Sequence, residues 1–142
     1  MAAHTEPVDS TESIGQTGGC ACGALRFRVD ARPRRVSICH CMTCRRIHGS
    51  AFGAYAMFER GAVTISGPTR AWQSSPEAQR HFCPTCGSVA FMDFPARDEL
   101  DIPLGAFDRP GLYEPTYELW CCHKEPWLPD GVRTEYDEER VR

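Results

Sequence analysis

The spacing of the cysteines constrains this chain more than any other feature of its sequence. Seven of its nine cysteines fall into three short clusters. In chain order these are Cys20 and Cys22, then Cys39, Cys41 and Cys44, and then Cys83 and Cys86. The two pairs together supply four thiolates, the ligand set of a closed structural zinc, whereas the cluster of three is one ligand short of a tetrahedral site. The sequence therefore predicts a closed zinc site and an open one that keeps a position for water or substrate.

Disulfide bonds are the alternative use of clustered cysteines. Residues 1–17 are polar and lack the apolar stretch of a secretory signal, so we expect a cytoplasmic protein. In a reducing cytosol, clustered cysteines favour metal binding or catalysis. Nine cysteines cannot all pair, and two cysteines separated by one residue are poor disulfide partners. These arguments favour metal ligands over a disulfide framework.

Composition limits the classes of partner. The chain has 142 residues, of which 25% are charged and 42% hydrophobic, as in an ordinary soluble domain. Its net charge of −3 provides no attraction for nucleic acid or for an anionic membrane surface. No apolar run approaches the roughly 18 residues that cross a bilayer. We therefore expect neither a nucleic acid nor a membrane as partner, and the sequence does not indicate an oligomeric state.

Short alternating segments predict the fold class. Residues 1–17 are expected to form a disordered N-terminal tail, residues 18–130 a zinc domain, and residues 131–142 a C-terminal tail. Strands are expected at 25–30, 36–38, 51–58, 63–65, 69–73, around 80–82, and at 88–94, 98–104 and 117–122. Eleven prolines and twelve glycines argue against long helices. The sequence therefore predicts a mainly β domain of short antiparallel strands that zinc staples together.

The closed site joins distant parts of the chain. Cys83 and Cys86 form a knuckle followed by Gly87, which allows the backbone to turn sharply beneath the sulfurs. Cys20 and Cys22 lie about 60 residues away, so a shared zinc would clamp the fold, and metal binding at such sites contributes directly to folding. The alternative is that one pair consists of buried thiols only.

The open site predicts a particular chemistry. Cys39 and Cys41 share one face if the chain is extended, His40 between them points away, and Cys44 returns after a short turn. Three thiolates on Zn²⁺ leave a net charge of −1, so this metal would be a poor Lewis acid for making hydroxide. A soft thiolate is its natural fourth ligand. The pattern therefore favours a small thiol substrate that is held as a nucleophile.

Three alternatives to this interpretation stay open at the level of sequence. The second zinc is structural if another side chain completes it, and the candidates are His48, His81, Cys121, Cys122 and His123. A two-zinc ribbon that binds a protein partner without catalysis is a second alternative, although such a module needs ligands in sets of four. A third is a thiol-redox or metal-buffering protein that uses the adjacent Cys121 and Cys122.

Five segments together resemble a known family. They are residues 19–23, 39–50, 82–88, 117–120 and 125–128, in this order. With these motifs the chain resembles the glutathione-dependent formaldehyde-activating enzyme family. The resemblance implies the zinc-stapled, Mss4-like β-tent fold and two zinc ions per chain. It implies a structural zinc on Cys20, Cys22, Cys83 and Cys86 and a catalytic one on Cys39, Cys41 and Cys44. It also implies a carbon–sulfur lyase that reversibly joins glutathione to formaldehyde as S-hydroxymethylglutathione.

Residues next to the open site are candidates for substrate binding. Arg45 and Arg46 follow the third cysteine of this cluster, and two guanidinium groups there are suited to the carboxylates of glutathione. Ser50, after Gly49, offers a hydroxyl to a substrate oxygen. The alternatives are a solvated pair of arginines and a simple Gly-Ser turn.

Overall fold

The computed structural model describes residues 14–140, and most of the predicted N-terminal tail lies outside this range. Its strands form two sheets. The smaller sheet has the order β1-β2-β5 and the larger one the order β11-β10-β3-β4-β9-β8-β7-β6. All pairings are antiparallel except those of β10, which runs parallel to both β3 and β11. The predicted class, a mainly β domain of short antiparallel strands, is confirmed, and the parallel pairings of β10 are the exception to it.

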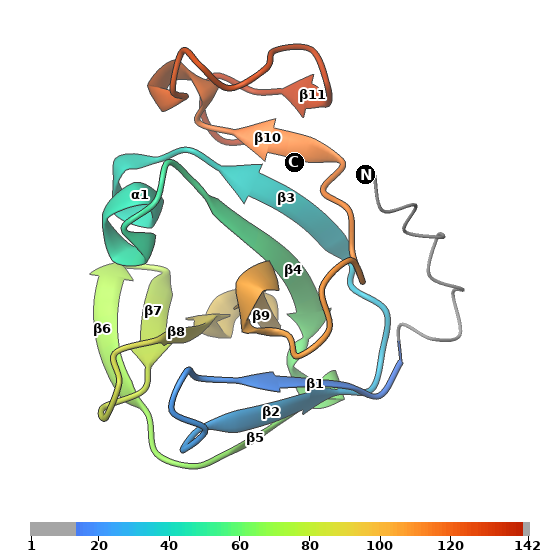
Figure 1. The fold of residues 1–142 in the computed structure, drawn as a ribbon, viewed down its shortest axis with the longest axis vertical. Coiled ribbons are helices and arrows are strands. Elements are labelled where there is room, and N and C mark those ends of the chain that lie inside the picture. Colours follow the sequence, from blue (N-terminus) through green and yellow to red (C-terminus); the bar gives the residue numbers. More distant parts are fainter. Residues whose placement is uncertain (1–13, 141–142) are drawn as a thin grey trace, which may run out of the picture.

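The elements have the following bounds. The strands are β1 (Gln16–Gly19), β2 (Arg26–Val29), β3 (Arg35–Cys39), β4 (Gly53–Glu59), β5 (Val63–Ser66), β6 (Arg70–Ser75), β7 (Ala78–Phe82), β8 (Val89–Phe94), β9 (Glu99–Pro103), β10 (Tyr117–Leu119) and β11 (Thr134–Glu135). The helical segments are α1 (Met42–His48) and the 3₁₀ turns η1 (Arg60–Ala62), η2 (Pro95–Arg97), η3 (Leu104–Ala106) and η4 (Cys121–His123). In Figure 1 the small sheet lies at the bottom, and β10 and β11 lie at the top beside β3.

The large sheet has two differently used faces. Alternate residues of a strand point to opposite faces, so Ala56 and Phe58 of β4 join the main apolar core, which also contains Phe27 and Val29 of the small sheet. The intervening side chains of β4, Tyr55 and Met57, point to the other face, where they pack with Cys39 and Cys44. The core thus holds the two sheets together and leaves the opposite face of the large sheet for the site.

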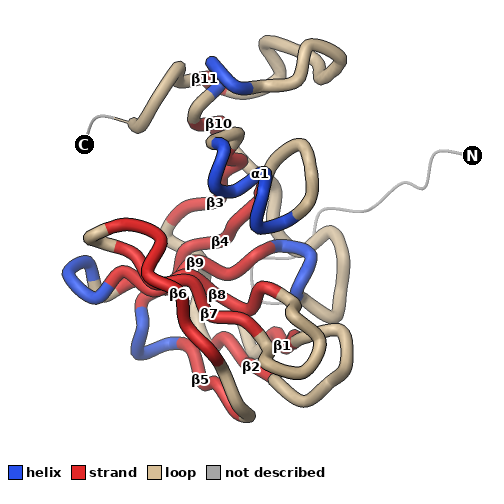
Figure 2. The backbone as a smooth tube through the Cα atoms, turned by 90° about the vertical axis from the view of Figure 1, so that its left-hand side faces the viewer, coloured by secondary structure: helices blue, strands red, loops and turns tan. Residues whose placement is uncertain are grey.

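The C-terminal segment differs from the sequence expectation. The predicted strand over 117–122 ends at Leu119, because Trp120 adopts a left-handed conformation with φ of 55° and the turn η4 follows. The described part of the predicted tail packs on the domain, since β11 pairs with β10 and the Tyr136 amide donates to the Glu118 carbonyl at 2.9 Å. Figure 2 shows this segment along the upper edge of the molecule, above α1. Within residues 14–140, no helix has the length and apolar character needed to span a membrane.

Candidate metal centres and the adjoining cavity

The first candidate centre is the four-cysteine site, made by Cys20, Cys22, Cys83 and Cys86. Ligand atoms of these residues all lie within 4.8 Å of one another. The Cys22 sulfur is 3.5 Å from that of Cys20 and 3.7 Å from that of Cys83. Sulfurs of a tetrahedral zinc site with Zn–S bonds of about 2.3 Å are about 3.8 Å apart, whereas disulfide sulfurs are about 2 Å apart. The spacing therefore fits a tetrahedral thiolate site.

Local backbone geometry prepares these sulfurs for a cation. The Leu25 amide donates to the Cys20 sulfur at 3.2 Å, which lowers the pKa of that thiol. Hydrogen bonds from Ser88 lower the pKa of Cys86 to about 5. Gly87 has φ of 77° and its amide donates to the Cys83 carbonyl, as the knuckle requires. Donors directed at sulfur favour thiolates, the form that binds zinc.

The second candidate centre is the three-cysteine site, made by Cys39, Cys41 and Cys44. Cys39 is the last residue of β3, Cys41 precedes α1, and Cys44 lies buried in the first turn of that helix. Their sulfurs lie within 4.8 Å of one another. The sequence predicted the grouping but not the helix, which turns Cys44 back so that its amide donates to the Cys41 sulfur at 3.3 Å.

Charge within the three-cysteine site fits a bound cation. Hydrogen bonds from the Cys39 and Cys44 thiols lower the pKa of Cys41 to about 2. The contacts of Cys39 with Cys41 and Cys44, followed by burial, raise the pKa of Cys39. One thiolate thus suppresses the ionisation of its neighbours when no cation is present, and a divalent soft metal would remove that conflict.

Two side chains from other strands contact Cys44. The Tyr55 hydroxyl donates to the Cys44 sulfur at 3.2 Å, and Arg80 Nη2 on β7 lies 3.6 Å from the same sulfur. Arg80 Nη1 also donates to the Tyr55 hydroxyl at 3.4 Å, and Nε donates to Ser74 at 3.0 Å. Burial alone would lower the pKa of Arg80, but the neighbouring Cys44 and Tyr55 outweigh it and raise that pKa. A buried cation therefore faces the thiolates.

Among the described residues, no other histidine, cysteine, aspartate or glutamate joins the three sulfurs within that 4.8 Å spacing. The three histidines considered as fourth ligands from the sequence make other contacts. His48 Nε2 is 2.7 Å from the Tyr55 hydroxyl, and His81 stacks on Phe91. His123 stacks on Trp120 at the edge of the neighbouring cavity. The three sulfurs are therefore the candidate metal ligands that the described residues bring together beside α1.

A cavity of about 770 Å³ adjoins the three sulfurs on the open face of the large sheet. One row of side chains in cross-strand register crosses its floor. The row runs over five neighbouring strands in the order Arg35, Met57, Asp101, Met92 and Arg80. Each of these side chains lines the cavity. The floor therefore consists of two apolar methionine side chains and three ionisable side chains.

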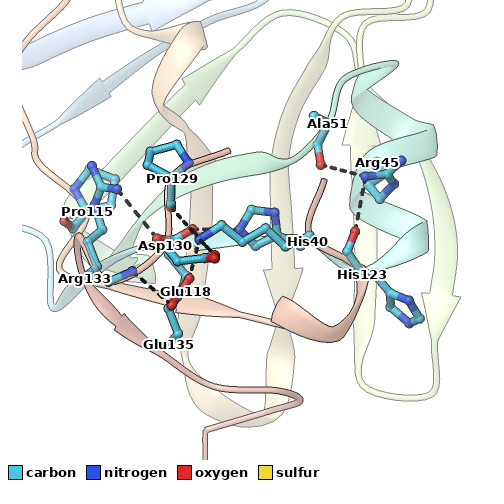
Figure 3. Close-up of polar contacts among 12 residues, drawn as sticks. His40, Arg45, Ala51, Pro115, Glu118, His123, Pro129, Asp130, Arg133 and Glu135 are labelled. Atoms are coloured by element: carbon cyan, nitrogen blue, oxygen red, sulfur yellow. Dashed lines mark hydrogen bonds and ion pairs between the residues drawn. The ribbon is translucent and has the colours of Figure 1, made fainter. Parts of the chain in front are cut away.

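The predicted substrate-binding residues lie away from this cavity. Arg45 forms an ion pair with Glu125 at 2.5 Å and donates to two backbone carbonyls, as Figure 3 shows for the carbonyls. Arg46 is exposed, and Ser50 lines a second cavity of about 570 Å³. None of the three is among the residues that line the cavity beside the three-cysteine site. Their role in substrate binding stays a prediction.

A buried polar network lies behind the three-cysteine site. As predicted, His40 points away from the sulfurs, and its Nε2 is 2.7 Å from Glu118 Oε1. Lys124 Nζ lies 3.6 Å from the same oxygen, and Arg133 Nη1 is 3.7 Å from the other one (Figure 3). His40, Glu118 and Cys121 are spaced like metal ligands, but the Lys124 cation already balances the carboxylate. The network fastens the C-terminal segment to β3.

Sequence reasoning missed the groups that β4, β7 and β9 bring to the site: Tyr55, Arg80 and Asp101. Arg80 had one available signal, because it alternates with the apolar residues Ala78 and Phe82 and so shares their face of a strand. Asp101 had none, because it alternates with the apolar residues Leu100 and Ile102. Only the order of strands, which is not visible in local patterns, places these side chains next to the cysteines.

Comparisons with known proteins found similar sequences and a similar fold. A model of the family described as glutathione-dependent formaldehyde-activating enzyme matches residues 15–123. A Halomonas elongata protein named putative glutathione-dependent formaldehyde-activating enzyme is 32% identical over 133 residues, covering 86% of this chain and 82% of that protein. A Schizosaccharomyces pombe protein named uncharacterized lyase is 30% identical over 77 residues, 54% of this chain, and the match spans only 56% of that protein. A crystal structure of a Rhodobacter sphaeroides protein shares the fold, with a TM-score of 0.54 at 20% identity, over 65% of this chain and 87% of that one.

Proposed function

Because the chain belongs to the glutathione-dependent formaldehyde-activating enzyme family, we propose that it is a zinc-dependent carbon–sulfur lyase. In this proposal it reversibly joins a small thiol, with glutathione favoured, to formaldehyde or a related aldehyde. The four-cysteine site holds a structural zinc and the three-cysteine site a catalytic one. A cytoplasmic location, where free thiols persist, belongs to the same proposal.

One observation carries the proposal: three clustered sulfurs, with no fourth protein ligand among the described residues, adjoin a cavity of about 770 Å³. Cavities of this size accept small-molecule ligands. A two-zinc binding module without catalysis is the second candidate, but it would need neither an incomplete ligand set nor an adjoining cavity.

The zinc at the three-cysteine site, when bound, would supply a soft positive centre that keeps a thiol ionised near neutral pH. Arg80 offsets negative charge at Cys44, and the Tyr55 hydroxyl holds that sulfur in place. Met57 and Met92 give the cavity floor an apolar surface that limits water around the reacting groups. Holding the thiol and aldehyde together converts a bimolecular encounter into an oriented reaction.

The chemical step needs no reactant other than the thiol and the aldehyde. The substrate sulfur forms a bond to the aldehyde carbon, and the π electron pair of the carbonyl moves to its oxygen. That oxygen takes up one proton, equivalent to the one that the thiol has lost. The reverse reaction breaks the carbon–sulfur bond and returns the thiol and the aldehyde.

Calorimetry with two ligands tests this proposal. Zinc-loaded protein should bind glutathione, and it should bind S-methylglutathione much more weakly, because a thioether is neutral and a poorer zinc ligand. Exchange between formaldehyde, glutathione and their adduct, followed by nuclear magnetic resonance, should be faster with the protein than without it. Equal affinity for the two compounds, or an unchanged exchange rate, would refute the proposed function.

A further inference from the structure

Asp101 is the middle residue of the row that crosses the cavity floor, and its buried carboxyl is unfavourable for the stability of the folded protein. It lies on β9, between β4 and β8, and is only 5% exposed. Its Oδ1 atom is buried and accepts no hydrogen bond. A buried polar atom of this kind destabilises the folded protein unless a partner compensates for the lost hydration. Because Asp101 lines the cavity, that partner can be a ligand.

The arginines near Asp101 are already occupied. Arg35 forms an ion pair with Glu99 at 2.6 Å, and Arg97 forms one with Glu77 at 3.2 Å. Arg80 is directed at Cys44, Tyr55 and Ser74. The neighbouring strands offer only Met57 and Met92 beside Asp101 in register, and neither can donate a hydrogen bond. The Asp101 carboxyl therefore still needs a hydrogen-bond donor or a cation as its partner on the cavity floor.

Position separates this carboxyl from the sulfurs. Asp101 pairs with Met57, whereas Tyr55, which contacts Cys44, pairs with Pro103. One strand spacing and two residues along the strand place the backbone of Asp101 about 8 Å from that of Tyr55. A ligand that reaches both the three-cysteine site and Asp101 must therefore carry its donor well away from its sulfur.

On the basis of the proposed function, we propose that Asp101 binds the ammonium group of an aminothiol substrate and so selects thiols that carry a free amine remote from the sulfur. Glutathione has this constitution, because its ammonium lies at the end of a γ-linked residue. Thiols without an amine would reach the three-cysteine site but would leave Asp101 without a partner.

The charge state of Asp101 agrees with this role. Burial, followed by the charge of Glu99, raises the pKa of its carboxyl to about 7, although Arg35, Arg97 and Arg80 act in the opposite direction. An ammonium group favours the ionised carboxylate and would release the proton on binding. Recognition of the amine should therefore strengthen as the pH rises through about 7, up to the pKa of the amine itself.

Paired ligands test the inference without disturbing the protein. We expect zinc-loaded wild-type protein at about pH 8 to bind glutathione about 10- to 100-fold more tightly than N-acetylglutathione, which keeps the thiol but lacks the ammonium. The ratio of the two affinities should rise between about pH 6 and about pH 8, because thiol ionisation is common to both compounds. A ratio that stays constant or falls over this interval would overturn the inference, because a contact of Asp101 with a substrate carboxylate would affect both compounds equally.

A substitution completes the test. Asp101→Asn keeps the shape of the side chain, so the ratio should fall close to one while the affinity for N-acetylglutathione stays unchanged. Glu77→Gln makes the same chemical change at an exposed position of the cavity rim and should keep the wild-type ratio. If Asp101→Asn keeps it too, the inference is wrong and the proposed function stands. If wild-type protein binds neither thiol, both fail.

Discussion

The guanidinium of Arg80 lies 3.6 Å from the sulfur of Cys44, although the two residues are 36 positions apart and lie on different elements. Arg80 is 8% exposed and Cys44 is 2% exposed, so water screens this contact little. Three thiolates on one zinc ion carry a net charge of −1, and Arg80 supplies the nearest positive charge to the Cys44 sulfur in the described chain.

Removing this cation should loosen the second metal alone. Arg80→Met is expected to lower the zinc affinity of the three-cysteine site about 10- to 100-fold, which corresponds to the loss of a hydrogen bond to a charged group. The four-cysteine site should keep its affinity. Competition with a graded series of chelators measures both values, and Arg97→Met, at the rim of the same cavity, serves as the matched control. Equal loosening of both metals by Arg80→Met would contradict the assignment.

Freshly purified protein should contain two zinc ions of unequal lability. The three-cysteine site keeps an open position where a chelator can attack, whereas the four-cysteine site is closed. We expect a fast and a slow phase of zinc release under mild chelation, with equal amplitudes. A single tightly held zinc per chain in untreated protein would count against the open site.

Serine substitutions should separate the roles of the two sites. Cys83→Ser breaks a site that joins segments 61 positions apart, so it should unfold or aggregate the protein. Cys41→Ser changes a local site within six consecutive residues and should leave the protein folded but inactive. Thermal melting measures the first effect and adduct exchange the second. Equal loss of melting temperature in the two variants would remove the distinction between a structural and a catalytic centre.

Gly53 should be intolerant of a side chain, because it lies opposite Cys39 and beneath the Tyr55 ring. A Cβ atom at this position would lie 2.6 Å from the Tyr55 hydroxyl. Gly53→Ala is therefore expected to displace Tyr55 from Cys44 and to cost about 1–3 kcal/mol of stability through overpacking. Gly61→Ala, where a Cβ atom meets nothing within 4 Å, is the control. Urea unfolding that gives the same stability for both variants would show that Tyr55 moves freely.

Asp101 should make the free energy of unfolding depend on pH. Its carboxyl has a pKa of about 7 in the folded protein and of about 3.9 when unfolded. Between these values the unfolded chain releases a proton that the folded protein keeps, so stability falls as the pH rises through this interval and then levels off. Asp101→Asn should therefore be more stable than wild type above about pH 7, by at most about 4 kcal/mol. The gain should shrink towards pH 4. Urea unfolding of the two ligand-free proteins measures it, and a variant that is less stable at every pH would show that the carboxylate has a structural partner.

Local sequence patterns predicted the parts of this molecule that depend on neighbouring residues. The division of seven cysteines into four and three follows from their spacing, and alternation located most of the strands, including β2 and β5. The predicted strand at 117–122 was too long because nothing in its composition indicates the left-handed turn at Trp120.

The rest of the site depends on the pairing of strands that are far apart in the sequence. Arg80 and Asp101 reach the cavity floor only because β9 and β8 lie between β4 and β7. Proximity in sequence does not by itself place a side chain at the cavity, since Arg45 directly follows the third cysteine of the three-cysteine site and yet pairs with Glu125 outside the cavity lining. Side chains of a short helix point in several directions, and the sequence does not say which of them faces the cavity.

The central claim is that a substrate thiol completes the metal at the three-cysteine site. The most direct measurement is a crystal structure of the zinc-loaded protein soaked with glutathione. We predict a sulfur of glutathione at about 2.3 Å from the zinc held by Cys39, Cys41 and Cys44, with the four-cysteine zinc unchanged. A fourth protein ligand on that zinc, with glutathione absent or bound elsewhere, would contradict the account.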